Sequence, residues 1–189
     1  KKFAGKLLQK ELEVINEIAE KGKKPVLAIL GGAKVSSKLK ILYNLIHKVD
    51  KIIIGGGMAY TFWKAQGKSI GNSLCEEDRL ELASELLQKA SSKGVRIHLP
   101  VDSTIADKFS ADATVTNCES YGIPSGWMGL DIGIKARTDF KKVISTAKTI
   151  LWNGPMGVFE MKPFQAGTLA IAEAVANATD KGAFSLVGG

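Results

Sequence analysis

Cysteine and histidine are scarce in this chain of 189 residues, which contains two of each. Cys75 and Cys118 are too far apart in the sequence to match a metal-ligand or redox motif, and two unpaired cysteines suit a reducing compartment. With only His47 and His98, a histidine-based metal site is not expected. We therefore predict a cytoplasmic protein, and we predict no metal ligands.

Long hydrophobic runs are also missing. No stretch approaches the ~20 apolar residues that a membrane-spanning helix needs, and the first residues lack the apolar core of a signal peptide. The chain contains no fixed-period repeat and no low-complexity segment. Its 45% hydrophobic and 24% charged residues are typical of a globular protein, and its length fits one ordinary domain. We expect no membrane partner and a monomer.

The net charge of +7 raises the question of an anionic partner, because 26 Lys and Arg residues outnumber 19 Asp and Glu residues. The positive charges are scattered along the sequence, and the densest group is Lys21, Lys23 and Lys24. Basic residues interleaved with aromatic residues, as in proteins that bind single strands, do not occur. We therefore interpret most lysines as solvated surface and predict no nucleic-acid partner.

Short apolar runs alternate with segments of helical periodicity. Strands are expected at 25–30, 51–54, 95–102, 149–154 and 182–189, and helices at 3–21, 36–47, 58–67, 76–94, 138–147 and 164–179. Residues 103–135 are expected to be irregular, with one extended stretch near 113–120. The alternation predicts an α/β fold of three layers, a Rossmann-like parallel sheet with helices on both faces.

Glycine-rich turns follow four of these strands, and the carboxyl ends of parallel strands are where such sheets bind ligands. The turns begin at Gly31, Gly55, Gly154 and Gly188. Glycine lets the backbone approach a ligand closely, and a following helix N-terminus attracts phosphate. The sequence therefore predicts a nucleotide site, although for the three glycines at 55–57, taken alone, a tight turn with close helix packing is the simpler explanation.

Lys34 and Lys38 follow the first turn at a spacing of four residues. If both lie on one helix face, both ammonium groups can reach the same anion. The segment has neither the Walker A spacing nor the pattern G-x-G-x-x-G. On spacing alone, two solvent-facing lysines are about as plausible as a phosphate site.

Two further loops carry candidate side chains. After the strand at 149–154, Asn153 offers an amide for phosphate, and Glu160 could accept hydrogen bonds from ribose hydroxyls or be a solvated surface acid. In the loop near 122–133, Trp127, Met128 and Leu130 could wall a purine pocket, or they could fill the core.

Taken together, these segments resemble one family, the phosphoglycerate kinases, in their C-terminal nucleotide-binding half. The stretches that carry the resemblance occur in the family's order and cover nearly the whole chain. They are GGAKVSSKL, IIIGGGMAYTF, IGNSL, LPVD with ADKF, GWMGLDIG, ILWNGPMGVFE and the final VGG.

The resemblance implies a kinase that transfers a phosphoryl group reversibly between 1,3-bisphosphoglycerate and ADP in glycolysis. It implies ATP or ADP with Mg²⁺ as cofactor, and 3-phosphoglycerate bound by a separate N-terminal domain. By resemblance, Lys34 steadies the transferring group and Lys38 contacts the nucleotide phosphates. Glu160 matches the ribose acceptor. The other nucleotide-binding positions implied are Gly31, Gly32, Ala33, Gly56, Gly57, Leu74, Gly129, Leu130, Asn153, Pro155, Gly157, Val158, Gly188 and Gly189.

Two residues depart from the family pattern. Ser37 stands where many members carry an acid, which affects how Lys38 is oriented. Ile134 replaces the proline usual after the sequence DIG, and we expect this to alter only a loop.

The resemblance also implies a domain organisation. Residues 1–21 would be a helix that connects to the N-terminal domain, and residues 22–189 a nucleotide-binding domain whose last turn continues beyond Gly189 to an aspartate that binds Mg²⁺. Such a piece would be inactive alone. Two other functions stay open: a dinucleotide-binding oxidoreductase, which NADH titration would reveal, and a nucleic-acid-binding module suggested only by the charge.

Overall fold

A computed structural model describes residues 18, 21–119 and 122–188 of the chain. Most of the helix expected at 3–21 lies outside the described residues, but Ile18 and Lys21 are helical. The backbone N–H of Gly22 bonds to the carbonyl of Ile18 at 2.8 Å, and a Cβ at Gly22 would meet that carbonyl at 2.6 Å.

The centre of the molecule is a parallel sheet of five strands, which confirms the predicted fold class. Its strands lie in the order β10-β9-β1-β2-β4. Their bounds are β1 (Val26–Leu30), β2 (Lys51–Ile54), β4 (Arg96–His98), β9 (Thr149–Asn153) and β10 (Phe184–Gly188). Numbered by their place in the chain, these strands follow the Rossmann order 3-2-1-4-5.

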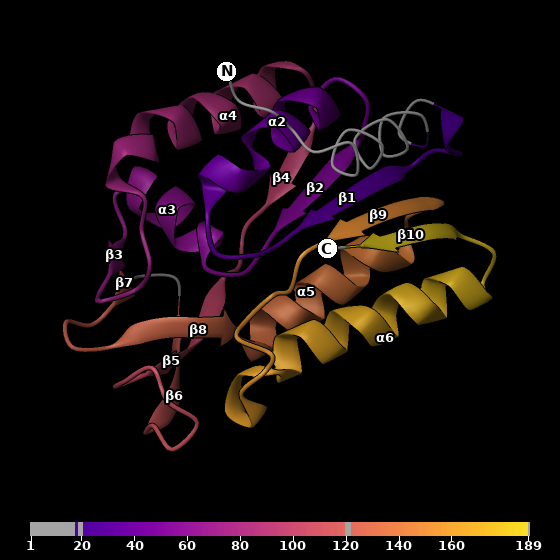
Figure 1. Cartoon of the computed structure of the whole chain (residues 1–189). Coiled ribbons are helices and arrows are strands. Elements are labelled where there is room, and N and C mark those ends of the chain that lie inside the picture. The colour runs from indigo at the N-terminus through magenta and orange to yellow at the C-terminus, as the bar shows by residue number, and fades with distance from the viewer. Residues whose placement is uncertain (1–17, 19–20, 120–121, 189) are drawn as a thin grey trace, which may run out of the picture.

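Helices cover both faces of this sheet (Figure 1). One face carries α2 (Val35–Leu45), α3 (Met58–Ala65) and α4 (Leu80–Ser92), the last preceded by the 3₁₀ helix η1 (Glu77–Arg79). The other carries α5 (Ile134–Ser145) and α6 (Ala166–Asp180), with η2 (Lys162–Phe164) before α6. Because both faces are covered, β1 is apolar and buried at every residue.

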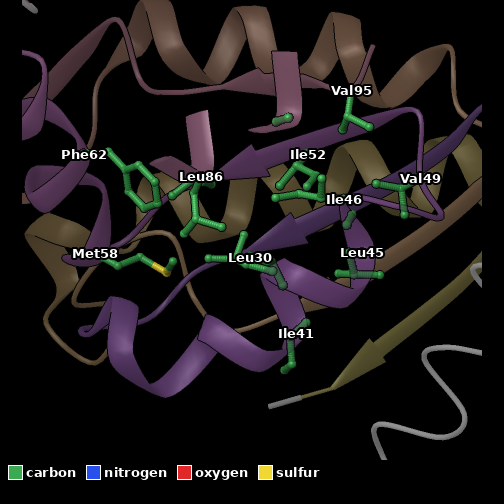
Figure 2. Close-up of a cluster of buried hydrophobic side chains, with 14 of the residues drawn as sticks. Leu30, Ile41, Leu45, Ile46, Val49, Ile52, Met58, Phe62, Leu86 and Val95 are labelled. Atoms are coloured by element: carbon green, nitrogen blue, oxygen red, sulfur yellow. The ribbon is translucent and has the colours of Figure 1, made fainter. Parts of the chain in front are cut away.

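Alternate side chains of β1 enter two separate cores. Ala28 and Leu30 point toward α2, α3 and α4, and Figure 2 shows Leu30 there beside Ile52, Met58 and Phe62. Leu27 and Ile29 point the other way, toward α5 and α6.

The expectation that residues 103–135 are irregular is wrong, except for the extended stretch near 113–120, which β6 (Val115–Glu119) confirms. β5 (Asp102–Ala106), β6 (Val115–Glu119) and β8 (Met128–Ile132) form an antiparallel sheet in the order β6-β5-β8, and β3 (Ser69–Ile70) pairs with β7 (Gly122–Ile123). The strand expected at 95–102 is therefore two elements, β4 and β5, separated at Pro100.

The sequence of β5 does not have the apolar pattern expected of a buried strand. Its polar residues Asp102, Ser103 and Thr104 can be buried because their side chains are hydrogen-bonded. The Asp102 carboxylate accepts the backbone N–H groups of Lys135 at 2.9 Å and Ala136 at 2.7 Å, and so caps the N-terminus of α5 from a distant strand. That cap places the start of α5 at Ile134, four residues before the predicted start.

Candidate functional site

The strand order places a crevice at the carboxyl ends of β1 and β9, since their connections run in opposite directions across the sheet. A pocket of about 460 Å³ lies there, a volume typical of small-molecule sites. Turns after β1, β2 and β9 supply one side of the pocket, and β8 with two loops supplies the other. The residues that line it are Gly32, Ala33, Gly56, Gly57, Asn72, Leu74, Phe109, Met128, Gly129, Leu130, Pro155, Gly157, Val158 and Glu160.

The three glycine-rich turns are bonded to one another through their backbones. The N–H of Gly32 bonds to the Pro155 carbonyl at 3.0 Å, and the N–H of Gly56 bonds to the Met156 carbonyl at 3.0 Å. A Cβ at Gly31 would meet the Pro155 carbonyl at 2.0 Å, and one at Gly56, whose φ is +68°, would meet Gly32 at 2.6 Å. Glycine is required at both positions because backbone packs directly on backbone.

The three glycines before α3 therefore serve two purposes. Gly56 is needed for close packing, the simpler of the two explanations considered for this turn. Gly57 is different: its φ of −58° and ψ of −28° suit any residue, and an added Cβ would lie 3.3 Å from Ala33 O and from a Leu74 methyl group. Since Gly57 also lines the pocket, its missing side chain leaves room for a ligand.

The opposite wall is largely apolar. Met128, Gly129 and Leu130 come from β8, and Leu74 and Phe109, which are 46% and 60% exposed, come from loops. A planar base in this pocket would meet methyl, methylene and backbone surface.

Trp127 does not join this wall. It packs with Trp63, Ile70 and Ile123 in a separate cluster, so its role is in the core.

Glycine is required at position 129 because the buried Tyr60 side chain lies directly against its backbone. A Cβ at Gly129 would come within 2.1 Å of the Tyr60 hydroxyl oxygen. That hydroxyl lies 2.6 Å from Ser103 Oγ, which in turn donates to the Asp131 carbonyl at 2.9 Å. Burial raises the pKa of the Tyr60 hydroxyl above its ordinary value, and the hydrogen bond with Ser103 lowers it in part.

Asp131 is a buried carboxylate at the back of the site. Its Oδ2 accepts the N–H of Gly167 at 2.6 Å, near the start of α6, and its Oδ1 accepts the N–H of Ile132 at 2.8 Å. A Cβ at Gly157, a pocket residue, would meet Oδ1 at 2.3 Å. Burial raises the pKa of Asp131 to about 6, although the two N–H donors and the charge of Arg137 lower it in part. Asp131 therefore ties β8, the loop after β9 and α6 together.

Lys38 lies at the margin of the pocket. Its Nζ donates to Asn153 Oδ1, and its Cε is the nearest heavy atom, at 3.8 Å, to a Cβ built on Gly32. The structure thus brings together two residues predicted to contact phosphate from elements 115 positions apart. Ser37 does not take part in this contact, because its Oγ donates to the Lys34 carbonyl at 2.7 Å.

Lys34 is not on the helix face shared with Lys38, as the spacing had suggested. It occupies the N-cap of α2 in an extended conformation, with φ −127° and ψ 131°, and its side chain is exposed. The two ammonium groups therefore start from different backbone geometries, and Lys34 is the more accessible.

The N-terminus of α2 is already occupied by a carboxylate. Glu76 Oε2 accepts the N–H of Ser36 at 2.9 Å, and Oε1 accepts the Ser36 hydroxyl. Burial alone would raise the pKa of Glu76, but hydrogen bonds from Ser36 and Val35 and the charge of Lys34 hold it below its ordinary value. A phosphate at this helix N-terminus would therefore compete with the Glu76 carboxylate for the N–H of Ser36, and its binding there stays a prediction.

The predicted site residues divide into two groups. Eleven line the pocket: Gly32, Ala33, Gly56, Gly57, Leu74, Gly129, Leu130, Pro155, Gly157, Val158 and Glu160. Those that do not are Gly31, Lys34, Lys38, Asn153 and Gly188. Gly188 ends β10, where its carbonyl accepts the N–H of Gly154 at 3.3 Å, and Gly189 lies outside the described residues.

Sequence reasoning missed Asn72 and Phe109 as pocket residues. Both stand in stretches that carry the family resemblance, IGNSL and ADKF, so a signal was present. Neither residue follows a strand of the central sheet, so the glycine-rich turns at the strand ends do not mark them.

Ile134 is not in a loop, and that expectation is wrong. It is the first residue of α5, and its side chain is 58% exposed. Proline is favoured at this position of a helix.

No group of three or more His, Cys, Asp or Glu side chains that could hold a metal ion occurs among residues 18, 21–119 and 122–188. The described helices include none that is long and apolar enough to cross a membrane.

Comparison with known proteins places the whole chain in one family. The family model described as phosphoglycerate kinase matches residues 1–189. The chain is 51% identical over 186 residues to cytosolic phosphoglycerate kinase of Triticum aestivum and 54% identical over 187 residues to phosphoglycerate kinase of Acidobacterium capsulatum. Each alignment covers 98% of this chain but 46% of the relative, so the chain spans about half the length of these relatives.

A solved structure of phosphoglycerate kinase from Coxiella burnetii superposes on the fold with a TM-score of 0.89 at 45% identity. The superposition covers 97% of this chain and 47% of that one. Relatives include a chloroplastic phosphoglycerate kinase of Arabidopsis thaliana, 51% identical over 186 residues that cover 98% of this chain and 39% of the relative, so the family is not confined to one compartment.

Proposed function

The chain belongs to the phosphoglycerate kinase family, and we propose that it is the nucleotide-binding half of an enzyme that transfers a phosphoryl group reversibly between 1,3-bisphosphoglycerate and ADP. The observation that carries this proposal is the pocket at the β1–β9 crevice, with the Lys38–Asn153 pair at its margin. An apolar recess beside a cation is the arrangement that a nucleotide requires, because its base is flat and weakly polar while its phosphates are charged.

We assign the parts of the nucleotide by the chemistry of the walls. The base lies between the backbone of Gly56 and Gly57 and the side chains of Leu74 and Leu130. Glu160, exposed on the rim, accepts hydrogen bonds from the ribose hydroxyls. The phosphates then extend toward Lys38 and Asn153, the remaining polar groups beside the glycine turns.

Lys34 is proposed to act on the transferring phosphoryl group. It is exposed at the N-cap of α2 and is not hydrogen-bonded to Asn153 as Lys38 is, so it can reach beyond the end of a bound diphosphate. Phosphoryl transfer asks a protein mainly for positioning and charge stabilisation, and lysine supplies both without a covalent intermediate.

Mg²⁺ is used with ATP and ADP across the family, but the described residues offer it no cluster of ligands. We therefore assign no residue of this chain to the metal. The metal would supply neutralisation of the phosphate charges.

The remaining expectations stay proposals. Residues 1–21 would lead from a phosphoglycerate-binding domain into the nucleotide domain at 22–189, and the enzyme would act as a cytoplasmic monomer. Isolated from that other domain, the chain would bind ADP but would not turn over.

Calorimetry with ADP tests this proposal. We expect Lys38→Ala to weaken binding by about 1–3 kcal/mol, the range for a hydrogen bond between a charged donor and phosphate. Lys34→Ala should cost less, because ADP has no transferring group for Lys34 to contact. Lys40→Ala, an exposed lysine on the same helix, is the control and should change little.

Three results would count against the proposal. The first is equal weakening by Lys34→Ala and Lys38→Ala. The second is tighter binding of NADH than of ADP, which favours the oxidoreductase alternative. The third is turnover with 3-phosphoglycerate and ATP at ~10 s⁻¹ or more, a rate typical of complete enzymes, which would refute the need for a second domain.

A further inference from the structure

Lysines and arginines gather at the edge of the central sheet opposite the pocket. Because the five strands are parallel, their amino ends all lie along this edge, which we call the basic edge. Its residues immediately precede or begin the strands: Lys23, Lys24, Lys51, Lys93, Arg96, Lys148 and Lys181.

Backbone contacts show that these residues are neighbours in space. The N–H of Lys148 bonds to the Pro25 carbonyl at 2.9 Å, and the N–H of Phe184 bonds to the Lys148 carbonyl at 2.9 Å. On the other side, Lys51 is the direct cross-strand partner of Arg96. Since neighbouring strands are about 4.8 Å apart, five strands spread the cations over roughly 19 Å.

The charge of this edge is almost unopposed. Among the described residues beside the seven cations, the acids are Asp50 and Asp180, so the formal charges of these nine residues sum to +5. Asp50 is engaged, because its carboxylate accepts the N–H of Val26 at 2.7 Å and lies 3.5 Å from Lys24 Nζ.

Lysines often lie at helix C-termini, where they offset the helix dipole. That explanation covers Lys93 and Lys181, the C-caps of α4 and α6. It does not cover Lys51 and Arg96, which begin β2 and β4, and the last turns of α2 and α6 contain no basic residue.

We infer that the basic edge binds the phosphate backbone of a nucleic-acid duplex without reading its bases. A narrow row of positive charges matches a linear polyanion. The ammonium group of lysine lacks the planar fork with which the guanidinium group of arginine forms paired hydrogen bonds, so a row made mainly of lysines gives no base specificity. A single strand fits less well, because Phe184 is the one exposed aromatic side chain described along the row, and single-strand sites use several. This surface is separate from the proposed nucleotide pocket and does not depend on it.

Fluorescence anisotropy with a labelled duplex of 20 base pairs tests the inference. If about five cations contact phosphates, the plot of log K against log salt should have a slope of about −4 to −5. Lys148→Glu combined with Lys181→Glu should weaken binding at least 10-fold at low salt and reduce the slope by about 2. Lys40→Glu combined with Lys162→Glu changes the net charge equally on exposed residues elsewhere and is the matched control. Thermal unfolding of each variant checks folding, and the milder Lys148→Gln with Lys181→Gln replaces the reversal if it fails to fold.

Several outcomes would overturn the inference. They are a wild-type slope shallower than −2, equal loss in the edge and control variants, and stronger binding to phosphatidylserine vesicles than to the duplex. Displacement of the duplex by saturating ADP would also overturn it, because the duplex would then occupy the pocket. Retained duplex binding in Lys38→Ala supports it, whether or not that variant still binds ADP.

Discussion

Replacing Asp131 with asparagine should change how the stability of the protein depends on pH. The wild-type carboxylate is 2% exposed and accepts hydrogen bonds from the backbone of Ile132 and Gly167. Asparagine keeps the shape and removes the charge, but its NH₂ group must face one of these N–H donors. We expect the lost hydrogen bond to cost about 1–3 kcal/mol at a pH where the wild-type carboxyl is neutral.

The charge acts in the opposite direction as pH rises. Burial raises the pKa of Asp131 from 3.8 to about 6, so between these values the folded protein holds a proton that the unfolded chain has released. Folding stability from this group is therefore full below about pH 4 and is lost as pH rises through about 6. A difference of about 2 units corresponds to about 3 kcal/mol, of which about 2 kcal/mol falls between pH 4.5 and 7.5. Asp131→Asn lacks this loss, so its stability relative to wild type should improve by that amount over the range.

Urea unfolding of both proteins at pH 4.5, 5.5, 6.5 and 7.5 measures the effect. Thr168→Val is the matched control, since it removes an uncharged hydrogen bond at the same end of α6, the one that Thr168 Oγ1 accepts from the N–H of Met156 at 3.0 Å. Its cost should be the same at every pH. A stability difference between Asp131→Asn and wild type that stays constant with pH, or that grows less favourable to the variant as pH rises, would refute the reasoning.

Three further predictions concern single positions. Gly56→Ala should destabilise the protein by about 2 kcal/mol or more in urea unfolding, because the φ of Gly56 is +68° and the new Cβ meets Gly32 at 2.6 Å. Gly57→Ala should leave the stability nearly unchanged but weaken ADP binding by about 1 kcal/mol or more. The reverse pattern would contradict the different roles that we give to these two glycines. Ile134→Pro should raise the stability by about 0.4–1 kcal/mol, since the preceding Gly133 is extended with ψ −178° and position 134 begins a helix. A loss of stability in thermal unfolding would show instead that the N–H of residue 134 is needed. Glu160→Gln should reduce affinity for ADP more than for 2′-deoxy-ADP in calorimetry, and identical losses for both would leave Glu160 as an exposed surface acid without a ribose contact.

The sequence alone determined the central sheet and the positions where ligands approach it. Continuous apolar runs marked β1 and β2 to within one residue, because strands covered on both faces must be apolar throughout. Glycines at the ends of those runs marked the turns that line the pocket, since only glycine allows backbone to pack on backbone there. These signals are local, so they can be read without knowing what the residues contact.

The tertiary structure decided what depends on distant partners. β5 was hidden because its polar side chains are satisfied by other elements, and α5 begins early because Asp102 caps it from another strand. Glu76 occupies the N-terminus of α2 from 40 residues away, and Asn153 orients Lys38 from 115 residues away.

The basic residues are the clearest case. Because they are scattered in the sequence, the sequence predicted no nucleic-acid partner. Only the parallel arrangement of the five strands brings the amino ends of the strands, and with them the basic residues, to one edge of the sheet. Sequence spacing cannot reveal such a surface, because strand order is set by contacts between residues far apart in the chain.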